Sequence, residues 1–277
     1  MYADLHLHTY FSDGTFSPEE VVERAEQQGL KAIAVTDHDT LDACPRAKEA
    51  CDDRGIEFVY GTELTAEIDG SEVHVLGYFL NIEDPQLQSQ IELFRKARVD
   101  RIYKMVDCLN KMGVQMEAKE VFEIANCKSP GRPHVARALI KKKVCPNYEA
   151  AFSRFLYNDG PAWVPKTRFP ASDAIDIIHN SGGLAVLAHP VLNKRDDLIP
   201  ELKDQGLDGI ECFHTKHSGF QAKKYCQIAN DNDLLISGGS DCHGFSKNRP
   251  LIGKIRLNED YFSRLRGAAQ SHSAAES

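Results

Sequence analysis

The first residues of the chain alternate between apolar and polar side chains, as in a strand. Leu5 and Leu7 are apolar, whereas Asp4, His6 and His8 are polar. Successive side chains of a strand point to opposite faces, so His6 and His8 are expected on the same face. Two imidazoles side by side can share one metal ion, although histidines on an edge strand facing water would give the same alternation. The pattern predicts a first strand with a candidate metal-binding face.

Short apolar runs separated by amphipathic stretches follow, which is the rhythm of an α/β fold. A helix is expected to begin at Ser17-Pro18-Glu19-Glu20, because Ser17 and Glu20 can form a capping box. The apolar runs predicted to be further strands lie at 32–35, 56–60, 72–79, 184–188, 209–213 and 234–237. The carboxyl ends of the strands of a closed parallel barrel converge on one mouth, where such enzymes react.

The pattern changes between about residues 94 and 164, where we find no strand alternation. Asp84-Pro85 opens a long helix, and shorter helical patterns follow at 118–126, 133–142 and 148–156. We interpret this stretch as a helical insertion laid over the mouth of the barrel. The predicted division is a first barrel part at 1–93, the insertion at 94–164 and a second barrel part at 165–277. The small and polar residues after about Gly267 are expected to be frayed.

Composition and charge narrow the class of protein. Of the 277 residues 42% are hydrophobic and 27% charged, which is typical of a soluble globular chain. The net charge of −8 argues against a basic surface that would hold long duplex DNA. Bound divalent cations could still attract phosphates locally. The apolar runs are too short to span a membrane. The eight cysteines form no C-x-x-C pair and no signal peptide precedes Asp4, so we expect reduced thiols and a cytoplasmic location.

Nine candidate metal ligands are expected at strand ends or in the loops just after them. They are His6, His8, Asp13, His38, Glu63, His74, His189, Asp241 and His243. A single histidine is more often an ordinary core or surface residue. Nine nitrogen and oxygen donors at one barrel face, however, are enough for two or three divalent ions with open positions for water and substrate. The sequence therefore predicts a metal centre at the mouth of the barrel.

The motifs that carry these residues resemble those of the polymerase and histidinol phosphatase (PHP) family. They are D-L-H-L-H-T-x-x-S-D-G from Asp4, T-D-H-D from Thr36, G-T-E from Gly61, H-x-L-G-Y from His74, A-H-P from Ala188 and G-S-D-x-H from Gly239. Together they cover residues 1–80 and 184–253. The resemblance implies a distorted, TIM-like (β/α)7 barrel and a phosphoesterase site with two or three metals.

The resemblance also implies how the ligands are divided among the metals. The first metal would take His6, His8, Glu63 and Asp241, the second Glu63, His74 and His189, and the third Asp13, His38 and His243. Mn²⁺ suits such a mixed nitrogen and oxygen site, with Fe or Zn as alternatives. The mechanism we infer is in-line attack on phosphorus by a metal-bound hydroxide that Glu63, Asp241 and His189 hold in place.

Two segments at the insertion resemble a branch of the family that hydrolyses small nucleotides. They are Ser129-Pro130-Gly131-Arg132-Pro133-His134 and Trp163-Val164-Pro165-Lys166. The branch includes nucleoside 3',5'-bisphosphate phosphatases and exonucleases that degrade short RNA from the 5' end. The residues expected to bind substrate are Arg132, His134, Lys166 and His217. The alternative is that these side chains are only solvated at the surface or cap a helix.

We therefore expect a metal-dependent phosphoesterase that acts on nucleotides. The candidate substrates are nucleoside 3',5'-bisphosphates, such as adenosine 3',5'-bisphosphate (pAp) converted to AMP and phosphate, and short 5'-phosphorylated RNA. Two alternatives remain open: another small-molecule phosphatase, such as a histidinol phosphatase, and a non-catalytic, metal-stabilised interaction module. The expected partner is a nucleotide or short oligonucleotide, and we expect no binding to long duplex DNA or to a membrane.

Overall fold

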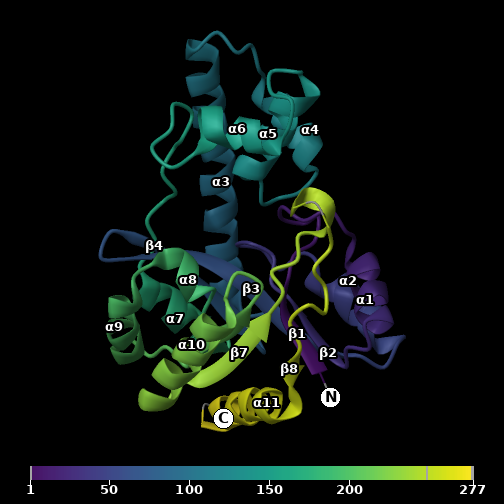
Figure 1. The fold of residues 1–277 in the computed structure, drawn as a ribbon, viewed down its shortest axis with the longest axis vertical. Helices are drawn as coiled ribbons and strands as arrows, with labels where there is room; N and C mark the ends of the chain where they lie inside the picture. The colour runs from purple at the N-terminus through teal and green to yellow at the C-terminus, as the bar shows by residue number, and fades with distance from the viewer. Residues whose placement is uncertain (1, 248, 276–277) are drawn as a thin grey trace.

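Eight strands form one sheet that curls into a nearly closed barrel (Figure 1). The computed structural model describes residues 2–247 and 249–275. The strands are β1 (Tyr2–Leu7), β2 (Ala32–Val35), β3 (Glu57–Ile68), β4 (Ser71–Tyr78), β5 (Leu184–Leu187), β6 (Gly209–His214), β7 (Leu235–Gly239) and β8 (Leu257–Asn258). Their order in the sheet is β7-β6-β5-β4-β3-β2-β1-β8. An isolated parallel bridge between Leu7 and Cys242 brings the chain after β7 back beside β1.

A glycine allows β7 to approach β1 closely. A Cβ atom built on Gly239 would lie 2.3 Å from Cβ of His6 and 2.4 Å from its backbone nitrogen. A larger residue could not occupy this position without moving one of the strands. The next residue, Ser240, donates its backbone N–H to the buried carboxylate of Asp4 at 2.8 Å. The loop that carries Asp241 is therefore held against the strand that carries His6.

The barrel is distorted at β3 and β4. The sequence predicted a strand ending near Glu63, but β3 continues to Ile68 and turns back into β4, which runs antiparallel to both β3 and β5. The turn residues Asp69 and Gly70 have φ angles of 47° and 70°, as a two-residue hairpin loop requires. His74 consequently lies within β4, opposite Thr65, and not at the end of a parallel strand. The parallel assignment of this strand was therefore wrong, and its alternation of polar and apolar residues is typical of an antiparallel strand.

Helices cover the outside of the barrel. They are α1 (Pro18–Gln27), α2 (Cys44–Asp52), α7 (Ala171–Asn180), α9 (Ile199–Asp204), α10 (Gly219–Asp231) and α11 (Glu259–Ala275), with the short turn η2 (Asp196–Leu198). The short helices α8 (Pro190–Asn193) and η3 (Gly244–Lys247) lie at the mouth of the barrel instead. The predicted capping box of α1 is present, since Ser17 accepts the N–H of Glu20 and Glu20 accepts that of Ser17. The expected fraying after Gly267 is wrong up to Ala275, and residues 276–277 lie outside the described part of the chain. Helix α11 continues to Ala275 because Phe262, Leu265 and Ala269 form one face that packs into the barrel core.

Further helices stand above the mouth of the barrel (Figure 1). They are α3 (Pro85–Lys111), α4 (Ala118–Ala125), α5 (Arg132–Lys141), α6 (Tyr148–Ala151) and the π-helical turn η1 (Phe152–Leu156). Residues 94–164, all of which the structure describes, contain no strand. Leu87 and Phe94 of α3 pack in the barrel core, whereas Ile102 and Leu109 pack in a separate core with the other insertion helices. The boundaries of 94 and 164 stay a proposal, because α3 runs unbroken from Pro85 to Lys111 through both cores.

Two further expectations concern the chain as a whole. Among the described residues, no helix combines the length and the apolar character that crossing a membrane needs. All eight cysteines are free thiols, in agreement with the expected absence of a disulfide framework.

Candidate metal centre and active-site cavity

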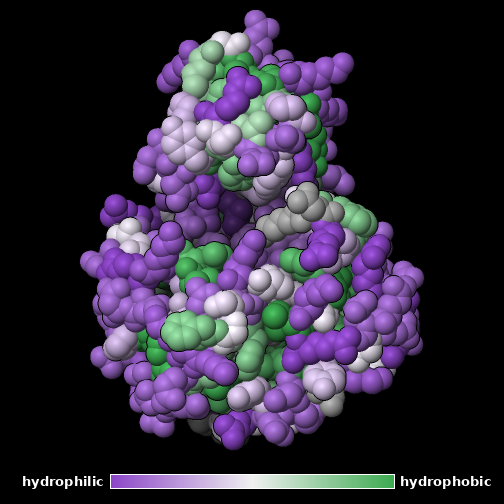
Figure 2. Space-filling model, in the orientation of Figure 1, coloured by the Kyte–Doolittle hydropathy of each residue, from purple (hydrophilic) through white to green (hydrophobic). Residues whose placement is uncertain are grey.

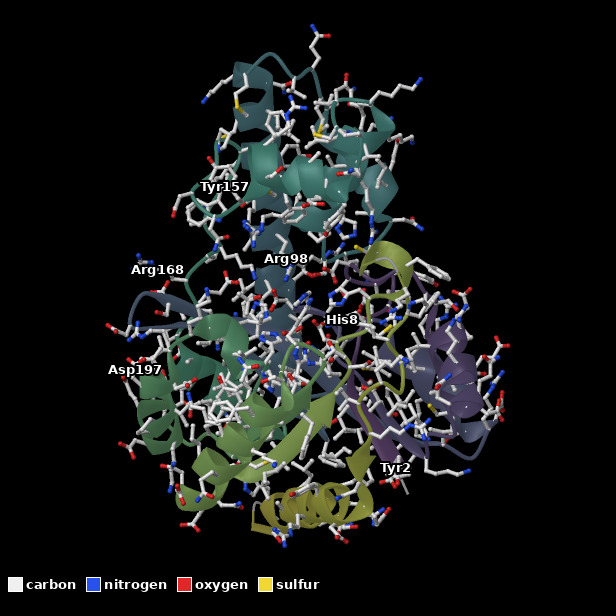
Figure 3. All side chains as sticks on the ribbon, in the orientation of Figure 1. Tyr2, His8, Arg98, Tyr157, Arg168 and Asp197 are labelled. Carbon is white, nitrogen blue, oxygen red and sulfur yellow. The ribbon has the colours of Figure 1, made fainter. Side chains whose placement is uncertain are left out.

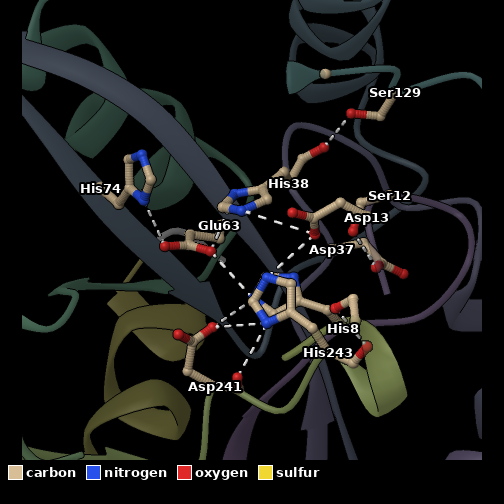
Figure 4. Close-up of polar contacts among 12 residues, drawn as sticks. His8, Ser12, Asp13, Asp37, His38, Glu63, His74, Ser129, Asp241 and His243 are labelled. Carbon is tan, nitrogen blue, oxygen red and sulfur yellow. Dashed lines mark hydrogen bonds and ion pairs between the residues drawn. The ribbon is translucent and has the colours of Figure 1, made fainter. Parts of the chain in front are cut away.

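The nine predicted ligands lie together at the mouth of the barrel, around the buried carboxylate of Glu63 (Figure 4). Its Oε1 atom is 2.7 Å from Nδ1 of His74 and 2.9 Å from Nε2 of His189. Its Oε2 atom has three imidazole nitrogens at 3.0–3.3 Å, from His38, His6 and His8. Each oxygen of this carboxylate thus faces its own group of histidines, which is the arrangement of a carboxylate that bridges two cations.

A second group of side chains adjoins the first, on the side of Asp13 (Figure 4). Nε2 of His243 is 3.1 Å from Oδ1 of Asp13, and Nδ1 of His243 is 3.2 Å from Oδ1 of Asp241. Nε2 of His8 lies 3.2 Å from the same oxygen of Asp241. Ligand atoms of His8, Asp13, His38 and His243 all lie within 4.8 Å of one another. Asp13, His38 and His243, the set expected for a third metal, are therefore neighbours.

Several buried polar atoms of this cluster have no hydrogen-bond partner, although buried polar groups are normally paired. Nδ1 of His8 and Nδ1 of His189 are two of them. Nδ1 of His38 and Oδ1 of Asp13 are two more, since they approach Glu63 and His243 at 3.0 Å and 3.1 Å but without hydrogen-bond geometry. In addition, Nε2 of His6 and Nε2 of His8 lie only 3.1 Å apart. Imidazole nitrogens and carboxylate oxygens that crowd together in this way fit divalent cations as their shared partner.

The charges of the cluster also suit cations. Burial alone would raise the pKa of Glu63, but His38, His74 and His6 hold it well below its usual value. Burial would likewise raise the pKa of Asp13, which His243 holds well below its usual value. Burial opposes a charge on His6, yet Glu211 and Glu63 raise its pKa well above normal. The carboxylates are thus anionic and the cluster attracts positive charge.

Two of the proposed ligands sit on strained backbone. His189 has a φ of 28° and Asp241 a φ of 51°, values that residues with a Cβ atom seldom adopt. The backbone N–H of His189 donates to Oε2 of the buried Glu211 at 2.7 Å, and this contact helps to hold the strained loop. Such strain is concentrated at functional sites, where the surrounding structure fixes a side chain in one direction.

The sequence analysis missed two buried residues of β6 that support the cluster. Oε1 of Glu211 accepts a hydrogen bond from Nδ1 of His6 at 2.9 Å. Nδ1 of His214 accepts the N–H of Lys216, and its Nε2 lies 3.5 Å from Oδ2 of Asp241. The available signal was a glutamate within an otherwise apolar strand, since an unpaired glutamate is almost never fully buried.

Asp37, from the T-D-H-D motif, has a different task from its neighbour His38. Its carboxylate accepts the backbone N–H of Thr9 at 2.8 Å and the hydroxyl groups of Thr9 and Ser12. These bonds fix the loop after β1 that carries Asp13. The aspartate therefore positions a candidate ligand and does not join the cluster itself.

The cluster opens into a cavity of about 840 Å³ between the barrel and the insertion. Figure 2 shows the entrance as a hollow beneath the insertion helices, with polar residues around it. Figure 3 shows Arg98, on α3, at the level where the two parts meet, with His8 below it. The insertion side of the cavity combines cationic and aromatic side chains: Arg98, Arg101, Arg132, Tyr148, Phe152 and Trp163. Lys166 lines the cavity from the barrel side.

Only two of the four residues expected to bind substrate line this cavity, namely Arg132 and Lys166. His134 is fully buried in the insertion, where its Nδ1 accepts the N–H of Gly131 at 3.0 Å and caps α5. His217 donates from Nδ1 to the carbonyl of Cys212 and packs against the rings of His214 and Tyr225. Neither His134 nor His217 lines the cavity, and we propose a structural role for both.

Comparison with known proteins identifies the family. The PHP domain profile matches residues 4–156. The chain belongs to the PHP domain family. A solved structure, described as a candidate metal-dependent phosphoesterase from Bifidobacterium adolescentis, is similar with a TM-score of 0.88 at 31% identity. The similarity covers 95% of this chain and 94% of that one, and it confirms the expected barrel fold.

Three relatives of known activity are similar over most of their length. The 5'-3' exoribonuclease of Haemophilus influenzae is 31% identical over 266 residues, covering 91% of this chain and 96% of the relative. The 3',5'-nucleoside bisphosphate phosphatase of Chromobacterium violaceum is 31% identical, covering 87% and 86%. The phosphoribosyl 1,2-cyclic phosphate 1,2-diphosphodiesterase of Eggerthella lenta is also 31% identical, covering 91% and 98%. These relatives confirm the expected class, a PHP phosphoesterase, and differ from one another in substrate.

Proposed function

We propose that this PHP protein is a metal-dependent phosphoesterase that hydrolyses nucleotide phosphate esters. Its substrates are nucleoside 3',5'-bisphosphates, such as pAp, and short 5'-phosphorylated RNA. The observation that carries the proposal is the carboxylate of Glu63, which has histidines on both oxygens and faces a cavity with cationic and aromatic walls. A cytoplasmic location is part of the same proposal.

The nine clustered side chains would hold two or three divalent ions, for which we propose Mn²⁺, with Fe or Zn as alternatives. Such ions lower the pKa of bound water and neutralise charge that develops on phosphoryl oxygens. Glu63 would link the first set of ligands to the second, because Oε2 faces His6 and His8 whereas Oε1 faces His74 and His189. Asp13, His38 and His243 would form the third set.

The residues of the chain would provide position and orientation for the reaction. Glu63, Asp241 and His189 would fix the place from which water attacks phosphorus. Lys166 lines the cavity beside the cluster, with Nζ 3.3 Å from Nε2 of His74 and 3.1 Å from Oε1 of Glu72. An ammonium group there can stabilise the non-bridging oxygens of a phosphate ester.

Arg132 is proposed to hold a phosphate from the opposite side of the cavity. Its Nη1 atom donates to the carbonyl of Leu156 at 3.1 Å and to Oδ1 of Asn158 at 2.8 Å. Both contacts use the same nitrogen and both partners are uncharged. The guanidinium is therefore held in place while its charge stays available for an anion.

The aromatic side chains favour a nucleotide over a substrate without a base. Tyr148 and Phe152 both line the cavity, with ring centroids 4.8 Å apart and planes inclined by 32°. Trp163, the only tryptophan of the chain, also lines it. Nucleobases stack on such rings, and stacking accepts any base. Histidinol phosphate offers only a small aromatic ring, and a phosphoribosyl cyclic phosphate offers no aromatic ring.

A substrate panel tests the proposal against its alternatives. Protein loaded with Mn²⁺ would be given pAp, a short 5'-phosphorylated RNA, histidinol phosphate and phosphoribosyl 1,2-cyclic phosphate. We expect the highest kcat/KM for one of the two nucleotide substrates. A preference for histidinol phosphate or the cyclic phosphate would refute the nucleotide assignment. An absence of metal-dependent hydrolysis, including that of bis-p-nitrophenyl phosphate, would favour a non-catalytic module.

A further inference from the structure

Arg101, on α3, is a buried cation that the proposed mechanism has not yet used. Only 7% of its surface is exposed, and it lines the cavity. Its Nε atom donates to the backbone carbonyl of Val164 at 2.7 Å. Among the described residues, its two terminal nitrogens make no hydrogen bond, and no carboxylate lies within ion-pair distance of the guanidinium. The side chain is therefore fixed by one neutral contact while most of its N–H groups remain unused.

The acidic residues nearby are already paired with other cations. Arg98, one turn earlier on α3, makes a two-nitrogen contact with Asp39 at 2.8 Å and 2.6 Å. Lys166 pairs with Glu72 at 3.1 Å. Burial, together with the nearby charges of Arg132 and Arg98, lowers the pKa of Arg101 to about 10. At neutral pH Arg101 is still charged.

An unpaired buried charge is costly, so side chains of this kind are usually paired or bind a ligand. Arg132 shares the cavity and likewise has only neutral partners among the described residues. We propose that Arg101 and Arg132 together bind the phosphate group of the substrate that is not hydrolysed. The planar guanidinium fork matches the oxygens of a phosphate, and two forks can grip one dianion.

This subsite rests on the proposed function and makes it more specific. The metal cluster lies on the barrel side of the cavity, and the two arginines lie on the insertion side. A substrate that reaches both must carry a second phosphate beyond the ester that is cleaved. In pAp that group is the 5'-phosphate, whereas adenosine 3'-monophosphate lacks it. The insertion would thus select for the second phosphate.

The kinetic test compares Arg101→Gln with the wild-type protein, both loaded with Mn²⁺, on pAp and on adenosine 3'-monophosphate. We expect kcat/KM for pAp to fall on the order of 10- to 150-fold, the effect of losing a charge-assisted contact. The value for adenosine 3'-monophosphate should stay within about twofold. The matched control is Arg95→Gln, which removes an exposed arginine of the same helix, paired with Glu92, and should change neither value. Equal losses on both substrates, or no loss on pAp, would overturn the proposal.

A binding measurement separates failure of the subsite from failure of the proposed function. Thermal shifts of the metal-loaded protein would be recorded with adenosine 5'-monophosphate, with adenosine and with inorganic phosphate. We expect adenosine 5'-monophosphate to stabilise the wild-type protein more than adenosine does, and Arg101→Gln to lose most of this difference. That result would support the subsite even if pAp were not hydrolysed. An unchanged difference in Arg101→Gln would overturn it. A shift with inorganic phosphate that Arg101→Gln also abolishes would show that the subsite takes the free anion as well.

Discussion

Nδ1 of His6 donates a hydrogen bond to Oε1 of Glu211 at 2.9 Å, and both side chains are fully buried. This bond uses Nδ1 of His6 and leaves its Nε2 directed at Glu63, where a bound metal ion could take the place of the proton. The other carboxylate oxygen of Glu211 accepts the backbone N–H of His189. One carboxylate thus orients two proposed ligands, although it lies outside the proposed ligand set.

Replacing Glu211 by glutamine should weaken the metal centre. A glutamine offers one acceptor in place of two, so it can serve either His6 or His189 but not both. We expect metal affinity to fall about 10- to 100-fold, as is usual when the partner of a ligand is lost. Metal titration of the apoprotein would measure this change. Glu26→Gln, which alters an exposed glutamate paired with Arg54, is the control. Equal titration curves for Glu211→Gln and the wild type would contradict the positioning role.

Replacing Glu63 by glutamine should be more severe. Both oxygens of Glu63 face imidazole nitrogens, and an amide cannot offer a charged oxygen to each side. We expect most of the activity to be lost and the metal content to fall. Elemental analysis of the purified variant, together with its turnover of pAp, would check both. Unchanged metal content with near-normal turnover would refute the ligand assignment.

Arg132→Ala should lower activity on substrates with two phosphates and leave activity on substrates with one phosphate nearly unchanged. A partly desolvated arginine–phosphate contact contributes roughly 1.5–3 kcal/mol, so kcat/KM for pAp should fall on the order of 10- to 150-fold. Hydrolysis of p-nitrophenyl phosphate, which has no second phosphate, should barely change and reports whether the metal centre is intact. If both substrates lose activity equally, Arg132 supports the fold or the metal centre instead.

His134 should make the stability of the protein depend on pH. Burial, with a smaller effect of Arg137, lowers the pKa of His134 to about 4, against about 6.5 in an unfolded chain. As pH falls below 6.5 the unfolded chain takes up this proton first, so folding stability is lost. At pH 5 this loss is about 2 kcal/mol.

An asparagine at position 134 offers an acceptor for the N–H of Gly131 but does not titrate. Chemical unfolding at pH 7 and pH 5 should therefore show a smaller decline for His134→Asn than for the wild type. Parallel declines would mean that other groups cause the acid sensitivity.

The candidate ligands could be predicted from the sequence because each stands out by residue type and position. His6 and His8 alternate with buried leucines. Asp241 and His243 follow the apolar run that begins at Leu234 and the two glycines that come after it, Gly238 and Gly239. The direction of β4 was missed, although the alternation of polar and apolar residues over Glu72-Val73-His74-Val75 is typical of an antiparallel strand. The Asp69-Gly70 pair was the local signal for the hairpin.

Other features depend on contacts between distant parts of the chain. Arg101 looks like any arginine of a long amphipathic helix, and only the packing of α3 against Val164 shows that it is buried, without a carboxylate partner among residues 2–247 and 249–275. His134 was expected at the cavity because of its neighbours in sequence. The helical turn instead directs its ring back to the N–H of Gly131. The roles proposed for Arg101 and His134 both depend on burial, and a local motif does not predict burial.

The most direct test of the central claim is the metal dependence of phosphate release from pAp. Wild-type protein would be stripped with a chelator, dialysed and titrated with Mn²⁺ while phosphate release is followed. We predict no phosphate release from the stripped protein and full recovery of the release rate as two or three Mn²⁺ ions bind per chain. Without these ions the clustered nitrogens and oxygens around Glu63 lack a shared partner. Full turnover of pAp by metal-free protein would contradict the claim.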